Sequence, residues 1–226
     1  MKYKKITNSD ITFFIKTLSE ENVFCSEVDL KKYSHDETED LSCLPEIVLK
    51  PCSTKEISEC LEYCNKHNIP VTACGARTGL SGGSIPLHGG VALSVENLNK
   101  IISIDKENLQ ATVESGVINQ NFKSEVEKSG LFYPPDPASL GSCMLGGNVA
   151  ENSGGPKALK YGVTRDYVLN LEVVLADGSI IWTGANVLKN ATGYSFTDLI
   201  VGSEGTLAVI TKIVFKLIAL PPKSAT

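Results

Sequence analysis

The sequence of 226 residues contains no apolar run of about 20 residues, the length that a membrane-spanning helix needs. Its first residues, from Met1 to Asp10, include no apolar segment of the kind found in a signal peptide. Basic residues are not in excess, because 21 Lys and Arg stand against 26 Asp and Glu. The net charge of −5 disfavours nucleic acid and anionic membrane surfaces as partners. With 42% hydrophobic residues, these absences predict a folded cytoplasmic protein without a membrane span.

The seven cysteines form no C-x-x-C pair, and their odd number does not fit a complete set of disulfides. Cys60 and Cys64 share one face of a predicted helix, but no histidine or carboxylate stands at ligand spacing beside them. The three histidines, His35, His67 and His88, lie in separate segments. We therefore expect buried free thiols in a reducing compartment and no bound metal.

Glycine is missing from the first 74 residues, and all 19 glycines lie between Gly75 and Gly205. This distribution predicts ordinary helices and strands first, and afterwards loops in which the backbone approaches another backbone or a ligand. For residues 1–44 we expect a helix near 9–20, capped by Asn8 or Ser9, followed by a polar arm over 27–40 that lies on the surface.

The later segments mix helix and strand signals without regular alternation, which favours an α+β fold. Ser53-Thr54-Lys55-Glu56 is a capping box, and Ile57, Cys60, Leu61 and Cys64 after it form one apolar stripe of a helix. A second helix is expected near 118–129. We expect strands at 46–49, 69–74, 91–95, 101–104, 111–113 and 206–217, and a hairpin over 171–182.

The first glycine-rich segment runs from Gly75 to Ser84, directly after a predicted strand. Four glycines in nine residues allow successive backbone N–H groups to turn inward, and such a nest binds anions. Hydroxyl side chains and Arg77 add donors, and no Asp or Glu lies between Glu62 and Glu96 in the sequence to repel a phosphate. The spacing matches neither the dinucleotide fingerprint nor the Walker loop. On its residues alone, the segment is either a phosphate cradle or a tight turn.

Two further segments have the composition of ligand-binding loops. Residues 133–139 are stiffened by three prolines and lead into residues 141–155, which contain two Gly-Gly pairs. Small and amide residues between these pairs suit close approach to a flat ligand with polar edges. Residues 199–207 form a tight turn that enters the last predicted strand.

Five motifs follow one another along the chain: Gly75-Ala-Arg-Thr-Gly-Leu-Ser-Gly-Gly83, Tyr133-Pro-Pro-Asp-Pro-Ala-Ser139, Gly146-Gly-Asn148 with Asn152-Ser-Gly-Gly155, Leu159-Lys-Tyr-Gly-Val-Thr-Arg-Asp166 and Gly202-Ser-Glu-Gly-Thr206. In this order they resemble the FAD-binding domain of the vanillyl-alcohol-oxidase-type flavoproteins, in the branch of the flavin-containing glycolate oxidases and D-lactate dehydrogenases. The resemblance covers about residues 45–221. It implies a two-lobed, p-cresol methylhydroxylase-type (PCMH-type) α+β domain over 45–226. Each lobe, at about 45–105 and 106–221, would be a small mixed sheet with flanking helices.

The resemblance implies FAD stretched between the two lobes. By analogy, the first loop would hold the diphosphate through Gly75, Ala76, Arg77, Thr78, Gly79, Gly82, Gly83 and Ser84. The ribityl and flavin side would be lined by Pro137, Ser142, Gly146, Gly147, Asn148, Asn152 and Gly155, with Tyr161 and Gly162 near the ring and Gly205 and Ile210 at the adenine end. Some relatives attach the flavin to a histidine near the first loop. No histidine lies between Gly75 and Leu87, so we expect non-covalent FAD.

The two arginines of the chain, Arg77 and Arg165, both fall inside these motifs. Near a flavin, an arginine could favour the anionic reduced flavin or orient a carboxylate substrate through a bidentate pair. The alternative for each is a structural salt bridge, for Arg165 with acidic residues near it. For Asp136 we expect a hydrogen bond within its own turn.

In this branch a second, C-terminal cap domain supplies the substrate pocket, catalytic histidines and, in some relatives, a metal. The chain stops at Thr226, so we expect the cap to be absent and no catalytic residue or turnover in this chain alone. For the intact enzyme the resemblance implies oxidation of a small 2-hydroxy acid, such as glycolate or D-lactate, by hydride transfer from Cα to flavin N5. The electron acceptor is not identified. The alternatives are the flavin domain of a related alcohol or sugar oxidase and a non-catalytic module of the same fold.

Overall fold

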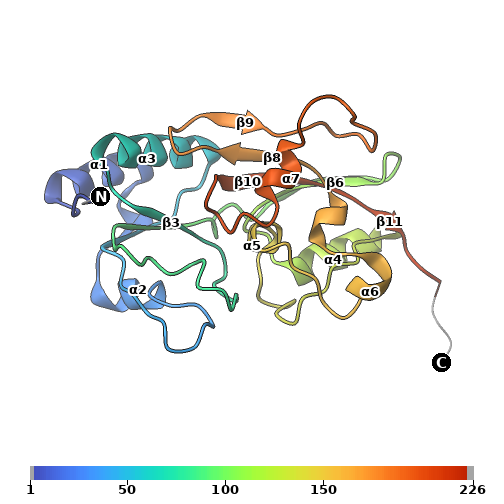
Figure 1. Cartoon of the computed structure of the whole chain (residues 1–226), viewed down its shortest axis with the longest axis horizontal. Helices are drawn as coiled ribbons and strands as arrows, with labels where there is room; N and C mark the ends of the chain where they lie inside the picture. Colours follow the sequence, from blue (N-terminus) through green and yellow to red (C-terminus); the bar gives the residue numbers. More distant parts are fainter. Residues whose placement is uncertain (1–2, 223–226) are drawn as a thin grey trace.

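The computed structural model describes residues 3–222, which form two lobes side by side (Figure 1). Each lobe contains one sheet, and helices flank both sheets. The expected α+β class with two small sheets is therefore confirmed. Within the described residues, none of the helices is both long enough and apolar enough to cross a bilayer.

The first lobe is built on a four-stranded sheet with the order β1-β2-β4-β3, in which β2 and β3 run parallel to β4. Its elements are α1 (Asn8–Leu18), the 3-10 helix η1 (Glu20–Asn22), β1 (Val23–Phe24), α2 (Glu27–Lys32), β2 (Ile47–Leu49), α3 (Thr54–His67), β3 (Val71–Cys74) and β4 (Val91–Ser94). The first glycine-rich loop leaves the carboxyl end of β3.

The second lobe is built on an antiparallel sheet with the order β5-β6-β10-β8-β9, and a short β11-β7 pair lies beside it. Its elements are β5 (Ile101–Asp105), β6 (Gln110–Glu114), α4 (Asn119–Lys128), β7 (Leu131–Phe132), α5 (Leu145–Ala150), α6 (Ala158–Tyr161), η2 (Thr164–Tyr167), β8 (Val168–Val174), β9 (Ile180–Trp182), α7 (Phe196–Ile200), β10 (Val209–Lys216) and β11 (Ile218–Ala219). In Figure 1, α5 lies at the centre, next to the first lobe.

Pairing of the strands moves the lobe boundary from its expected place near residue 105. β5 falls within the range expected for the first lobe, but it pairs with β6 in the second sheet. β1 falls within residues 1–44, which were expected to form a separate N-terminal segment, but it pairs with β2 in the first sheet. The segment before residue 45 is therefore part of the first lobe.

The helix predicted from the Ser53 capping box is α3. The Ser53 hydroxyl accepts a hydrogen bond from the Glu56 N–H at 3.2 Å, which satisfies one of the free donors at the helix start. All four residues of the predicted apolar stripe are buried. They pack against α1 and against one face of the first sheet, as a stripe of this width should.

The N-terminal helix is capped one residue earlier than expected. α1 starts at Asn8, and its N-cap is Thr7 rather than Asn8 or Ser9. The Asp10 carboxylate accepts from the Thr7 N–H at 2.8 Å and from the Thr7 hydroxyl at 2.6 Å. Lys4 and Tyr63 also donate to this buried carboxylate, so Asp10 fixes the helix start to the rest of the lobe.

The arm (residues 27–44) does not lie loosely on the surface, contrary to expectation. It begins with α2, and Tyr33, Ser34 and Asp36 after the helix are 3%, 3% and 6% exposed. Tyr33 packs with Val48 and with Cys74 on the face of the first sheet opposite to α3. The reason is topological: a parallel sheet needs apolar cover on both faces, and the arm supplies the second cover.

The cysteines are all free thiols, as expected. Cys60, Cys64, Cys74 and Cys143 are buried. The other three do not fit the expectation of burial, because Cys25 and Cys52 are exposed and Cys43 is half-buried.

One carboxylate joins the two lobes. Glu172 of β8, 7% exposed, accepts hydrogen bonds from Thr54 of the first lobe at 2.7 Å and from Thr211 and Lys212 of β10 at 2.9 and 3.0 Å. Val174 and Val209 of the same sheet belong to the apolar core of the first lobe. The lobes therefore share one core, with an ionic contact at its edge.

Glu172→Gln should lower the free energy of unfolding near pH 7 by about 1–3 kcal/mol, the usual contribution of a hydrogen bond to a charged group. Burial by itself would raise the pKa of Glu172, but the bonds from Thr54, Lys212 and Thr211 hold this pKa below its ordinary value. A carboxyl whose pKa is lowered by folding stabilises the protein above the pKa of the unfolded chain and loses that contribution as the pH falls through the folded pKa. Urea unfolding from pH 7 to pH 3 should therefore show the two proteins converging in acid. A difference that stays constant over this range would contradict the assignment.

Candidate functional site

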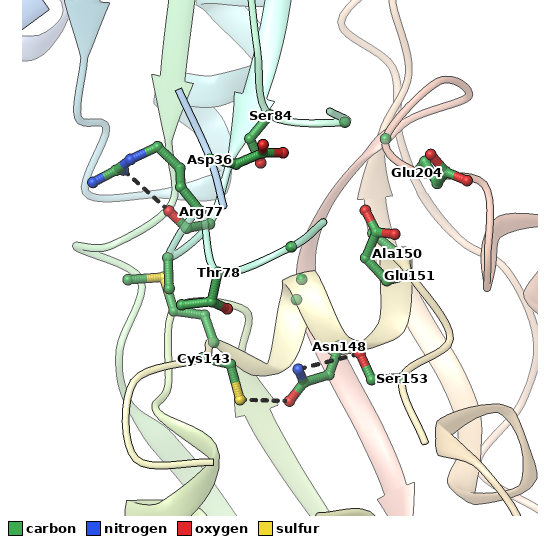
Figure 2. Close-up of a pocket in the computed structure, with 18 of the residues that line it drawn as sticks. Asp36, Arg77, Thr78, Ser84, Cys143, Asn148, Ala150, Glu151, Ser153 and Glu204 are labelled. Atoms are coloured by element: carbon green, nitrogen blue, oxygen red, sulfur yellow. Dashed lines mark hydrogen bonds between the residues drawn. The ribbon is translucent and has the colours of Figure 1, made fainter. Parts of the chain in front are cut away.

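A cavity of about 440 Å³ lies where the two lobes meet, a volume within the usual range of small-molecule sites. Its wall comes from the loop after β3, the turns on both sides of α5, the turn before β10, and Asp36 of the arm (Figure 2). Segments far apart in the sequence therefore form one site.

Most residues predicted to contact a cofactor lie in this wall: Gly75, Ala76, Arg77, Thr78, Gly79, Gly83, Ser84, Pro137, Gly146, Gly147, Asn148, Gly155, Gly205 and Ile210. The structure does not bring the others into the wall, namely Gly82, Ser142, Asn152, Tyr161 and Gly162. The contact of each residue with a cofactor stays a prediction.

The backbone of the first loop, residues 75–84, has the properties of an anion nest. Arg77 and Gly82 have φ angles of +57° and +76°, and such left-handed residues turn neighbouring N–H groups to one side. Among the described residues, none accepts a hydrogen bond from a backbone N–H of the stretch 76–84. Backbone donors in folded proteins are nearly always paired, so this run has donors left for a ligand or water.

The opposite wall is α5, and its two glycines have different surroundings. A Cβ at Gly146 would lie 2.7 Å from the Ser115 Cβ, so only glycine lets α5 approach the end of β6 this closely. A Cβ at Gly147 would meet no atom within 4 Å, so this position faces open space. A Cβ at Gly75 would lie 3.8 Å from the Gly147 Cα, which places the first loop directly across from α5.

Asn148 presents a fixed amide in the wall. Its Oδ1 accepts from the Asn119 Nδ2 at 2.8 Å and from the Cys143 thiol at 3.5 Å, and its Nδ2 donates to the Ser153 hydroxyl at 3.5 Å (Figure 2). The amide is 4% exposed, so these bonds set its orientation before any ligand enters.

Three carboxylates lie around the cavity, although the sequence around the first loop contains none. Figure 2 shows Glu151 and Glu204 on one side and Asp36 on the other. Glu151 Oε2 accepts from the Ser81 hydroxyl at 3.1 Å. Burial raises the pKa of Glu151; the Ser81 bond opposes this rise, whereas the charges of Glu204 and Asp36 add to it. The expectation that no acid stands near the first loop is therefore wrong, because the fold brings acids from distant segments.

Both arginines have structural partners. The Arg77 side chain extends away from Glu151 and Glu204, and its guanidinium donates to the Gly75 carbonyl at 3.3 Å (Figure 2). Arg165 lies outside the cavity wall and donates to the Asp198 and Val201 carbonyls, both at 2.6 Å. Its carboxylate partner is Asp198, at 3.7 Å, which agrees with the salt-bridge alternative. Neither guanidinium reaches into the cavity, so positive charge at this site does not come from arginine.

Several predicted contact residues outside the wall support its loops instead. Asn152 Oδ1 accepts from the Arg165 N–H at 2.9 Å, and the Tyr161 carbonyl accepts from the Tyr167 hydroxyl at 2.6 Å. A Cβ at Gly162 would lie 2.2 Å from an Asp166 carboxylate oxygen, so this glycine permits a close turn.

The hydrogen bond expected from Asp136 within its own turn is replaced by a longer-range pair. The Asp136 carboxylate accepts from the Lys157 N–H at 3.2 Å and pairs with the Lys157 ammonium, also at 3.2 Å. Asp136 therefore joins the proline-rich turn to the Gly154-Gly155 turn, and both line the cavity.

Lys123 of α4 is a residue that the sequence did not single out. It is 6% exposed and donates to the Pro134 and Pro135 carbonyls at 3.3 and 3.2 Å, which holds the proline-rich turn. Burial lowers the pKa of Lys123 to about 8. A lysine in a polar helical stretch ordinarily faces water, so no local signal could have found it.

The arrangement fits FAD. The free N–H groups of the first loop match a diphosphate, which binds to nests of backbone donors. Gly147 and Gly79, neither of which has a neighbour within 4 Å of its Cβ position, leave room in the wall for a flat ring or a sugar. The backbone that a bound nucleotide must approach is therefore accessible.

Comparison with known proteins agrees with this geometry. The family model of the FAD binding domain matches residues 45–184. The chain is 48% identical over 194 residues to the glycolate oxidase subunit GlcD of Bacillus subtilis, covering 86% of this chain and 41% of the relative. It is 42% identical over 221 residues to a D-lactate dehydrogenase of Anaerostipes hadrus, covering 97% and 46%. The crystal structure of p-cresol methylhydroxylase with substrate bound aligns with a TM-score of 0.84 at 23% identity, covering 98% of this chain and 46% of that one.

The chain spans less than half the length of the curated relatives that it matches. The structural alignment establishes the PCMH-type fold, and the family model covers more than half of the chain. On this evidence the chain belongs to the FAD-binding domain family, and FAD is its cofactor.

Proposed function

We propose that the chain is the FAD-binding part of an oxidoreductase that oxidises a small 2-hydroxy acid. The observation that carries this proposal is the run of unpaired backbone N–H groups in residues 76–84, which faces α5 across a cavity of nucleotide-binding size. The similarity to a glycolate oxidase and to a D-lactate dehydrogenase supports the substrate class.

In this proposal the residues of the chain bind and orient the cofactor. The first loop would hold the diphosphate through N–H groups, and Asn148 would offer its fixed amide beside the ring. When bound, FAD supplies an acceptor for two electrons and a hydride from the hydroxy acid. Lys123 and Asp136 keep the proline-rich turn in place, so the wall near Pro137 is set before the cofactor binds.

We propose that FAD is held without a covalent bond. His88, the histidine nearest to the first loop in sequence, is exposed beside Tyr3, with ring centroids 5.0 Å apart, and does not line the cavity. Free thiols throughout the chain support a reducing, cytoplasmic location as part of the same proposal. We propose further that substrate binding and turnover need a cap domain in addition to this chain, and that an unidentified acceptor takes the electrons.

The test is to purify the chain, record its absorbance, and identify the nucleotide released by denaturation. We expect flavin bands and FAD rather than FMN, released without proteolysis. Addition of glycolate, D-lactate or D-2-hydroxyglutarate should leave the flavin of this chain oxidised, and one of them should bleach the full-length gene product.

The outcomes separate the alternatives. A chain that fails to take up FAD on titration would overturn the proposal and favour a non-catalytic module. Bleaching of the full-length protein by an alcohol or sugar, but not by hydroxy acids, would assign another substrate class. Rapid bleaching of the chain alone would contradict the need for a cap.

A further inference from the structure

The arm lies against the first glycine-rich loop. The Glu37 N–H donates to the Gly79 carbonyl at 3.0 Å, and Asp36 lines the cavity beside the same loop. A Cβ at Gly82 would lie 3.2 Å from the Leu41 side chain, so arm and loop are in close contact at two places. The arm precedes the residues matched by the family model, which begins at residue 45.

Arg77 gives the loop its shape and is held from outside the cavity. A non-glycine residue with a φ of +57° is uncommon and persists where its surroundings determine it. The Arg77 guanidinium carbon lies 4.0 Å from the centroid of the Tyr33 ring, a cation–π distance. The same guanidinium donates to the Gly75 carbonyl, so it connects Tyr33 to the first turn of the nest.

Tyr33 itself is fixed at both ends. Its ring is 3% exposed, and its hydroxyl donates to Glu96 Oε2 at 2.8 Å. Glu96 pairs in turn with Lys50 at 2.6 Å. The tyrosine is therefore anchored to the residues that follow β2 and β4, which belong to the rigid first sheet.

We propose that Tyr33 is a positioning residue for FAD: by packing on Arg77 it holds residues 75–84 with their N–H groups toward the cavity. The inference rests on the proposed binding of the FAD diphosphate at this loop. It gives Arg77 a role in cofactor binding that needs no contact between its charge and the cofactor. It also makes the arm part of the binding site.

A double-mutant cycle on the Kd for FAD tests the pair. Tyr33→Leu and Arg77→Gln should each weaken binding about tenfold, the scale of a desolvated cation–π contact. The double variant should be no weaker than about tenfold, because both changes remove the same contact. Tyr33→Phe keeps the ring over Arg77 and should restore affinity to within about threefold. Phe24→Leu is the matched control: Phe24 packs beside Tyr33 in the same small cluster, its ring 4.6 Å from the Lys50 ammonium, and its loss should leave the Kd unchanged.

Urea unfolding of the FAD-free variants separates positioning from folding. A lower unfolding midpoint with an unchanged Kd would show a merely structural Tyr33 and overturn the inference. Single effects that multiply to about a hundredfold in the double variant would also overturn it, because the two residues would then act independently. If the unmodified chain itself does not bind FAD, the proposed function fails instead, and the cycle has no starting affinity to compare.

Discussion

Gly147→Leu should abolish FAD binding while the chain remains folded. Gly147 lies in α5, has no φ in the left-handed region, and has open space where a side chain would begin. A leucine there would fill the space between α5 and the first loop. We expect the Kd for FAD to rise at least about 100-fold, which corresponds to about 2.8 kcal/mol. The free energy of unfolding should stay the same or rise slightly, because glycine within a helix is about 0.5–1 kcal/mol less favourable than alanine.

Gly141→Leu is the control for that experiment. Gly141 also has no neighbour within 4 Å of its Cβ position and no positive φ, but it lies outside the cavity wall. The two variants add the same side chain to equally open glycines. Titration with FAD, followed by flavin fluorescence, should distinguish them. Equal affinity for FAD in the Gly147 variant and the unmodified chain would show that the cofactor does not pass between α5 and the first loop.

Gly155→Ala should damage both stability and binding. Gly155 has a φ of +127°, and a Cβ there would lie 2.2 Å from the Asp136 carbonyl oxygen. The conformation is open essentially only to glycine, and the contact is with backbone that cannot move aside cheaply. We expect the free energy of unfolding to fall by about 2–4 kcal/mol, the range of strained backbone combined with overpacking. FAD should bind more weakly as well, because the clash separates the two turns that carry Pro137 and Gly155 into the wall.

The adjacent glycine provides the comparison. At Gly154 a Cβ would make ordinary contacts of 3.5 Å with Ala158 and Val163, and φ is not positive. Gly154→Ala should therefore change the unfolding free energy by less than about 1 kcal/mol. Urea unfolding measures both. Similar, small losses in the two variants would show that the turn at 155 relaxes, and the assigned strain would be wrong.

The helices and the order of the loops were predictable because their signals are local. The capping box at Ser53 and the apolar stripe from Ile57 to Cys64 describe one helix, and the structure contains it. The glycine-rich segments also marked the loops of the site, since a dense run of glycines has few other uses. α1 shows the limit of such signals. Its cap depends on Asp10, which is buried by Lys4 and Tyr63 from outside the helix.

The charges of the site were not predictable in the same way. Along the chain, the nearest acids to the first loop are Glu62 and Glu96, so the loop reads as free of carboxylates. In space, Asp36, Glu151 and Glu204 surround the cavity, because three different segments meet there. Conversely, Arg77 reads as a positive charge for a phosphate, whereas Tyr33 and the Gly75 carbonyl draw its side chain to the other side of the loop.

The sequence alone determined which backbone is free to bind a ligand: the glycines of residues 75–84 and 141–155 specify turns that other residues could not form at little cost. Conformational preference is a property of each residue and its immediate neighbours, so it can be read without the fold. The tertiary structure alone decided which groups face that backbone, how charged they are, and what holds the loop in shape. Burial, pKa and side-chain direction depend on atoms from distant segments, as Tyr33, Lys123 and Glu151 show.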